Sequence, residues 1–208
     1  MATIQRLRRK TNGDAALSRQ LILDTTERLM REEGYAAVST RRVASEAGLK
    51  PPLVHYYYRT TDDLLLAAYA RTAEQMFDRL DIALASDDPI QALWMLNTDR
   101  DRTTLTVEFM ALANHRKSIR NELARNIERF RRRQAEVLAQ VAGRRVKPSG
   151  TAPPVGIAMM LAGISRGLVM ERALGVSLGH DEAEQFVAWW MNSVRPAPRR
   201  RRRVARSA

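Results

Sequence analysis

Apolar residues recur along the chain at the three- and four-residue spacing of a helix, and no run shows the two-residue alternation of a strand long enough for a sheet. The spacing predicts an all-α chain of about nine helices. The first ends at Gly34, and short ones follow from Ser39 and from Pro51. The others are expected over about 61–85, 89–97, 101–115, 118–142, 155–175 and 180–194.

Local signals mark several helix ends. Ser39 offers an N-cap, Pro51 suits the first turn of a helix, and Thr60 or Thr61 precedes two acidic residues that favour the positive end of a helix dipole. Glycine suits the position after a helix, as at Gly34 and Gly48. One apolar stripe identifies the first helix, of roughly four turns: Leu17, Leu21, Ile22, Thr25, Leu29 and Met30.

Two short helices joined by a turn that contains Gly48 predict a helix-turn-helix, the arrangement that places a recognition helix in the major groove of DNA. With Val54 in the core, about 100° per residue places Tyr58 toward the core, Tyr57 at its rim and Tyr56 outward. Tyr57 is either a rim contact for DNA or an ordinary core aromatic.

A set of residues in this region carries a family resemblance. The set comprises Gly34-Tyr35, Ser39-Thr40, Val43-Ala44, Ala47-Gly48-Leu49, Val54-His55-Tyr56-Tyr57-Tyr58 and Leu64-Leu65. With these spacings, the segment from about Leu21 to Leu65 resembles the DNA-binding region of the tetracycline-repressor (TetR) family of bacterial regulators.

The resemblance implies roles for individual residues. Positions matching Thr40, His55 and Tyr57 bond DNA phosphates in the family. The positions that face the groove match Arg41, Lys50, Pro51, Pro52, Leu53 and Tyr56. The chain departs from the family pattern at Leu53, where a small residue is common, and at Thr61, where a lysine is common. The predicted DNA-binding residues are Ser39, Thr40, Arg41, Lys50, Pro51, Pro52, Leu53, His55, Tyr56, Tyr57 and Thr61.

The later helices, over about 63–194, resemble the family's ligand-binding and dimerisation domain. We expect a homodimer through about 155–194 and an apolar pocket for a hydrophobic or aromatic effector, although each pocket candidate also suits an ordinary core. The helix that begins near Asp62 would link the pocket to the DNA-binding unit. The pocket candidates are Phe77, Trp94, Phe109, Met110, Ala113, Phe130, Met160 and Ile164, with Glu108, Asn114, His115 and Glu171 as polar candidates nearby.

The two ends of the chain are distinguished by their charge and composition. Residues 1–11 and 195–208 hold eleven basic and no acidic side chains, so they supply eleven of the twelve net positive charges. We predict a disordered basic arm over 1–15, a DNA-binding domain over 16–62 and a disordered arginine-rich tail over 195–208. The tail either binds the phosphate backbone or is merely solvated. There is no cysteine, and we expect a soluble, cytoplasmic protein with no signal peptide and no membrane span.

These observations predict a ligand-responsive transcriptional regulator, most simply a repressor that binds palindromic double-stranded DNA. A general nucleic-acid-binding or architectural protein is the alternative, supported by the basic tails. An enzyme is not expected, because no paired carboxylates, nucleophile and base, or phosphate loop occur at a recognisable spacing. We expect no cofactor and no metal.

Overall fold

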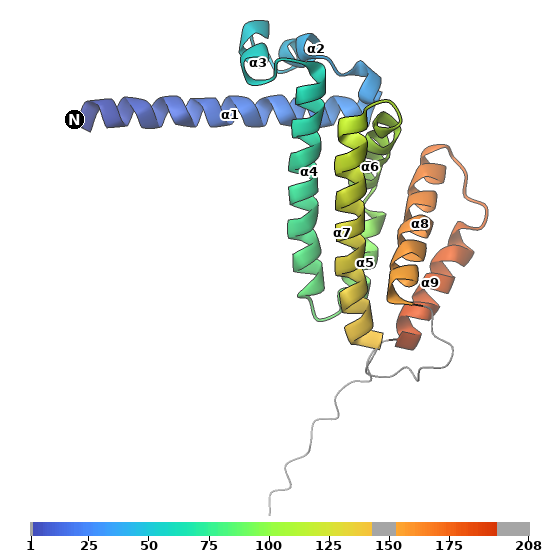
Figure 1. The fold of residues 1–208 in the computed structure, drawn as a ribbon. Coiled ribbons are helices and arrows are strands. Elements are labelled where there is room, and N and C mark those ends of the chain that lie inside the picture. Colours follow the sequence, from blue (N-terminus) through green and yellow to red (C-terminus); the bar gives the residue numbers. More distant parts are fainter. Residues whose placement is uncertain (1, 143–152, 195–208) are drawn as a thin grey trace, which may run out of the picture.

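The computed structural model of the 208-residue chain describes residues 2–142 and 153–194, with side chains for 14–140 and 153–193. This part of the chain is helical and contains no strand (Figure 1), as the apolar spacing predicts. The helices are α1 (Ala2–Glu33), η1 (Tyr35–Ala37), α2 (Thr40–Glu46), α3 (Pro51–Tyr57), α4 (Thr61–Leu84), α5 (Pro89–Thr98), α6 (Arg100–Ala113), α7 (Lys117–Ala142), α8 (Pro154–Ala173) and α9 (His180–Val194).

The helices divide into two groups. Figure 1 shows α1 lying across one end of an upright bundle of α4 to α7, with α2 and α3 beyond it and α8 and α9 along the side of the bundle. One core joins the groups, because Ile22 of α1 and Val54 of α3 belong to the same buried cluster as Phe109 of α6 and Ile119 of α7. The domain boundary that we predicted between residues 62 and 63 therefore does not separate two hydrophobic cores.

α1 is longer than the sequence pattern predicts. It extends back to Ala2, through the segment for which we expected a disordered arm over 1–15. That segment contains no proline, and its arginine, alanine and glutamine residues favour helix. Of the predicted stripe, Leu17 and Leu21 are exposed, whereas Ile22, Leu29 and Met30 are completely buried.

Capping side chains begin the helices at the positions that local signals indicate. The Thr60 hydroxyl accepts the Asp63 N–H, and the Asp63 carboxylate accepts the Thr60 N–H, both at 3.0 Å. This capping box begins α4. Asp88 caps α5, whose first residue is Pro89. Most of the segment between the helices expected over 118–142 and 155–175, and all of the tail predicted at 195–208, lie outside the described residues.

α8 is the one helix in the described ranges that is long and apolar enough to cross a membrane by length and composition. It instead packs against α5, α6, α7 and α9. Ala158 and Leu161 of α8 lie in a second core cluster with Leu138 of α7 and Val187 of α9. We therefore treat α8 as a bundle helix.

Candidate DNA interface and effector cavity

Gly48 fixes the turn between α2 and α3. Its φ of 65° lies in the left-handed region that glycine adopts without steric cost. The Gly48 N–H donates to the Ser45 carbonyl (3.2 Å), and the Leu49 N–H donates to the Ala44 carbonyl (2.9 Å). These two bonds close the end of α2 in a Schellman motif. The turn sets the angle at which Pro51 begins α3.

α2 begins with one arginine that is free and one that is paired. The Ser39 hydroxyl oxygen accepts the Arg42 N–H at 3.1 Å and so caps the helix. The Arg42 side chain forms ion pairs with Glu33 (3.0 Å) and Glu46 (3.4 Å). Arg41 is exposed and forms no ion pair with any residue that the structure describes. Its guanidinium therefore remains free to bind phosphate or guanine.

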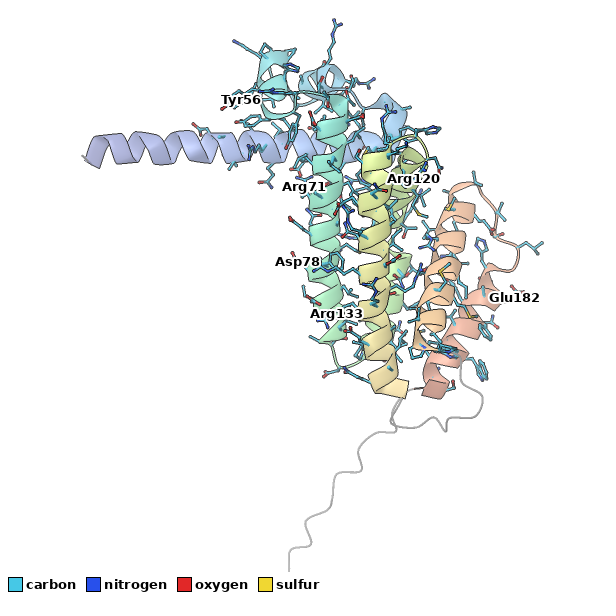
Figure 2. All side chains as sticks on the ribbon, viewed as in Figure 1. Tyr56, Arg71, Asp78, Arg120, Arg133 and Glu182 are labelled. Atoms are coloured by element: carbon cyan, nitrogen blue, oxygen red, sulfur yellow. The ribbon has the colours of Figure 1, made fainter. Side chains whose placement is uncertain are left out.

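α3 presents an exposed surface around one buried residue. Val54 is completely buried, whereas residues 50–52 and His55 are exposed and Leu53 is half-buried. Tyr56 is 79% exposed. Figure 2 shows Tyr56 at the end of the molecule that carries α2 and α3. The exposed surface thus has a basic residue, Lys50, just before α3 and the apolar rings of Pro51 and Pro52 in its first turn.

The three tyrosines differ in exposure. α3 ends at Tyr57, and Tyr58 has an extended backbone (φ −136°, ψ 104°), so the helical wheel no longer applies to it. Tyr57 and Tyr58 are both half-buried against the first core, and burial raises the pKa of Tyr58. The Arg19 guanidinium lies 5.2 Å from the Tyr57 ring centroid. The Tyr57 hydroxyl has no hydrogen-bond partner among the described residues.

The eleven predicted DNA-binding residues lie in α2, in α3, in the residues that precede these helices, and at the start of α4. They therefore share one end of the molecule. Arg19 of α1 joins them through Tyr57, and nothing in the sequence pattern indicated this contact. The exposed members are Arg41, Lys50, Pro51, Pro52, His55 and Tyr56, and the half-buried ones are Ser39, Thr40, Leu53, Tyr57 and Thr61.

The bundle contains a cavity of about 130 Å³ among α4, α5, α6, α7 and α8. α4 and α7 each contribute one face with helical spacing, including Tyr69, Thr72 and Phe77 of α4 and Phe130 of α7. The Phe77 and Phe130 rings lie 6.0 Å apart. The cavity wall is therefore largely apolar and partly aromatic.

Three of the eight predicted pocket residues line this cavity: Phe77, Phe109 and Phe130. The other five do not belong to its wall. Ala113 lies in the first core cluster, and Trp94 and Ile164 pack against the second. Met110 and Met160 are exposed. Met110 directly follows the wall residue Phe109 on α6, and Met160 lies on a different face of α8 from the wall residues of that helix.

Several polar wall residues were not predicted. Arg131 and Gln134 of α7 and Arg166 of α8 line the cavity. Arg131 lies in the sequence Arg129-Phe-Arg-Arg-Arg133, which reads as a solvated helix face. Only the rotation of α7 against its neighbours decides which of these arginines turns inward.

The four polar candidates near the predicted pocket do not line the cavity. Glu108 accepts the Tyr35 N–H at 2.8 Å and so holds the junction of α1 and α2. Glu171 is hydrogen-bonded to the ring of the buried His180 at 2.9 Å. The remaining two, Asn114 and His115, are exposed beyond the end of α6.

Comparison with known proteins identifies the family. Residues 22–68 match the domain described as "Bacterial regulatory proteins, tetR family". Residues 91–195 match "BetI-type transcriptional repressor, C-terminal", which covers half of the chain. The chain therefore belongs to the TetR family, whose members are DNA-binding transcriptional regulators and not enzymes.

Two relatives are named regulators. The chain is 32% identical over 110 residues to the HTH-type transcriptional regulator PksA of Bacillus subtilis (strain 168), which covers 49% of this chain and 54% of that protein. It is 26% identical over 95 residues to the HTH-type transcriptional regulator BetI of Rhizobium meliloti (strain 1021), covering 46% and 42%. The match thus spans about half the length of these relatives.

Solved structures share the fold. A transcriptional regulator from Saccharomonospora viridis in complex with choline superposes with a TM-score of 0.73 at 22% identity, covering 85% of this chain and 96% of that one. A TetR transcription regulator from Haloarcula marismortui gives a TM-score of 0.70 at 21% identity, covering 87% and 100%. At these identities, the likeness supports the fold alone.

Proposed function

We propose that this chain is a cytoplasmic, homodimeric repressor that binds a palindromic operator and releases it when a small, largely apolar effector enters the cavity. The observation that carries the proposal is the joint presence of two features. An exposed recognition surface occupies α2 and α3, and a cavity lies in the helices that hold this surface in place. Such a regulator has one state that binds the operator and one that releases it. The effector shifts the equilibrium between these two states only if it binds them with different affinities.

The recognition surface suits the reading of base edges. Arg41 would donate two hydrogen bonds to a guanine, and Pro52 and Leu53 would contact thymine methyl groups. The free hydroxyl of Tyr57 would donate to a phosphate, and so would Thr40 at the start of α2 and His55 in α3. Base contacts would specify the operator, and phosphate contacts would fix the position of α3 on it.

An exposed apolar face on α8 and α9 supports the dimer. Four large apolar side chains here are about half exposed or more: Met159 of α8, Leu174 at the C-cap of α8, and Phe186 and Trp189 of α9. Soluble monomers rarely expose such a face, and a second copy would cover it by two-fold symmetry. Sedimentation should show a dimer for the chain and for Ile82→Asp, an exposed apolar residue on α4, but a monomer for Trp189→Asp. A dimeric Trp189→Asp variant would place the interface elsewhere.

α6 offers a route from the cavity to the DNA-binding helices. Phe109 lines the cavity, and the adjacent Glu108 holds the Tyr35 N–H at 2.8 Å. At the end of α6, the Arg116 Nε lies 2.9 Å from the Asp62 carboxylate in the first turn of α4. A ligand that displaces Phe109 would therefore move both the junction of α1 and α2 and the start of α4, and so change the separation of two recognition helices.

A selection from random duplex DNA tests the proposal. The purified chain should enrich a palindrome whose half-site centres lie about 34–36 Å apart, one helical turn of DNA. Enrichment of no motif, with equal affinity for all duplexes, would instead favour a general nucleic-acid-binding protein that acts through its basic ends.

A further inference from the structure

The cavity carries positive charge without a negative partner. Arg131 and Arg166 are both wall residues, and no aspartate or glutamate is among the residues that line the cavity. Two carboxylates outside the wall bond to wall residues, Glu27 to Thr72 (3.2 Å) and Glu122 to Asn126 (3.5 Å). Each of these carboxylates also has an arginine partner of its own. The two wall arginines therefore give the cavity a net positive charge.

Neither wall arginine is neutralised elsewhere in the described part of the chain. Neighbouring arginines on α7 are paired, since Arg132 bonds to Glu128 (2.7 Å) and Arg133 to Asp81 (3.1 Å). Arg131 and Arg166 form no ion pair with a described residue. The segments 1–13, 143–152 and 195–208 contain no aspartate or glutamate, so no acidic side chain remains for either arginine.

This arrangement is unfavourable for a chain without a ligand. Burial lowers the pKa of Arg166, and the positive charge of Arg131 lowers it further. Arginine nevertheless stays protonated at neutral pH. Two guanidinium groups that share a partly apolar cavity repel each other and lose hydration. An anion between them would remove both costs and accept charge-assisted hydrogen bonds.

The rest of the cavity limits the size and shape of that anion. The volume of about 130 Å³ is close to the ~150 Å³ of a known cavity that binds benzene. Phe77, Phe109 and Phe130 form an aromatic part of the wall. The cavity therefore suits one ring or a short branched chain that carries an acid group.

We propose that the effector is a small organic carboxylate, with its acid group held by Arg131 and Arg166 and its single apolar group among the phenylalanines of the wall. This inference rests on the proposed function, because it names the chemical class of the effector that the cavity takes. The same two charges oppose a quaternary ammonium compound such as choline, the ligand of the Saccharomonospora regulator. The charge of the proposed effector is therefore opposite to that of the ligand bound by this structural neighbour.

Three ligands of one shape and different charge test the inference. Benzoate, benzamide and benzamidine carry charges of −1, 0 and +1 on the same ring, and phenylacetate with its amide and amidine extends the series by one carbon. Calorimetric titration of the full chain should show the carboxylate binding at least about tenfold more tightly than the amide, and the amidine and choline most weakly. Arg166→Gln and Arg131→Gln should each reduce the preference for carboxylate over amide, whereas Arg132→Gln, on the exposed face of α7, should retain it.

The variants remain informative because folding is measured separately. Arg166→Gln removes a half-buried charge without a partner, so its melting temperature should be no lower than that of Arg132→Gln. Equal affinities for the three charges, tighter binding of benzamidine or choline, no binding of either carboxylate, or a full carboxylate preference in Arg166→Gln would overturn the inference. The operator selection, performed without ligand, tests the proposed function independently. A chain that enriches an operator yet prefers a cation contradicts only the inference.

Discussion

Replacing Glu108 with alanine tests how the effector-binding helices hold the DNA-binding helices. The Glu108 carboxylate accepts the Tyr35 N–H at 2.8 Å, and Gly34, with a φ of 83°, brings the backbone close to this carboxylate. A hydrogen bond to a charged acceptor contributes about 1.5–3 kcal/mol. Because Tyr35 is half-buried, water would partly replace the lost partner, and we expect the lower end of that range, about 1.5–2 kcal/mol.

The loss is measurable by urea unfolding and by hydrogen exchange at the Tyr35 amide. For a chain of this size, the melting temperature should fall by about 3–8 °C. Glu108→Gln retains an acceptor without the charge and should lose about 1 kcal/mol or less. Glu74→Ala, on the exposed side of α4, is the matched control. If Glu108→Ala unfolds within about 0.5 kcal/mol of this control, with unchanged exchange at Tyr35, Glu108 does not hold this junction.

Three further predictions concern DNA binding and the ends of the chain. Tyr57→Phe should weaken operator binding with little loss of stability, whereas Tyr58→Ala should lower the unfolding free energy by roughly 1–3 kcal/mol; the reverse pattern would exchange their roles. Arg41→Ala should cost about 1–3 kcal/mol of operator affinity, while Arg42→Ala, which breaks only exposed ion pairs, should change stability by less than about 1 kcal/mol and leave DNA affinity nearly intact. If the tail binds phosphates, deletion of 195–208 should flatten the log–log salt dependence by about 0.9 per phosphate lost, and an unchanged slope would show that it does not.

The sequence predicted the helices well because their ends depend on local chemistry. Ser39 caps α2 as expected, and of the two threonines expected to cap α4, Thr60 is the one that does so. Gly48 supplies the left-handed turn between α2 and α3. The length of α1 was not predictable in the same way. The segment before residue 16 has helix-forming residues, but it also contains Asn12-Gly13, a pair typical of turns, through which α1 nevertheless continues. Neither this pair nor the basic charge was a good guide to its backbone.

The cavity was only partly predictable because its wall depends on how each helix is rotated. Phe109 faces the cavity and Met110 faces solvent, although both are large apolar residues in one helix. Arg131 and Arg132 show the same difference among charged residues. An amphipathic pattern identifies the buried side of a helix, but it does not distinguish a side chain that fills the core from one that lines a cavity.

Parallel DNA selections with the chain and with Arg41→Ala test the central claim most directly, namely that α2 and α3 of two copies read DNA sequence. The account predicts a palindrome for the chain. For the variant, it predicts the same palindrome with relaxed preference at one symmetry-related position in each half-site. Enrichment of no motif, or an identical motif with undiminished preference at every position, would contradict it.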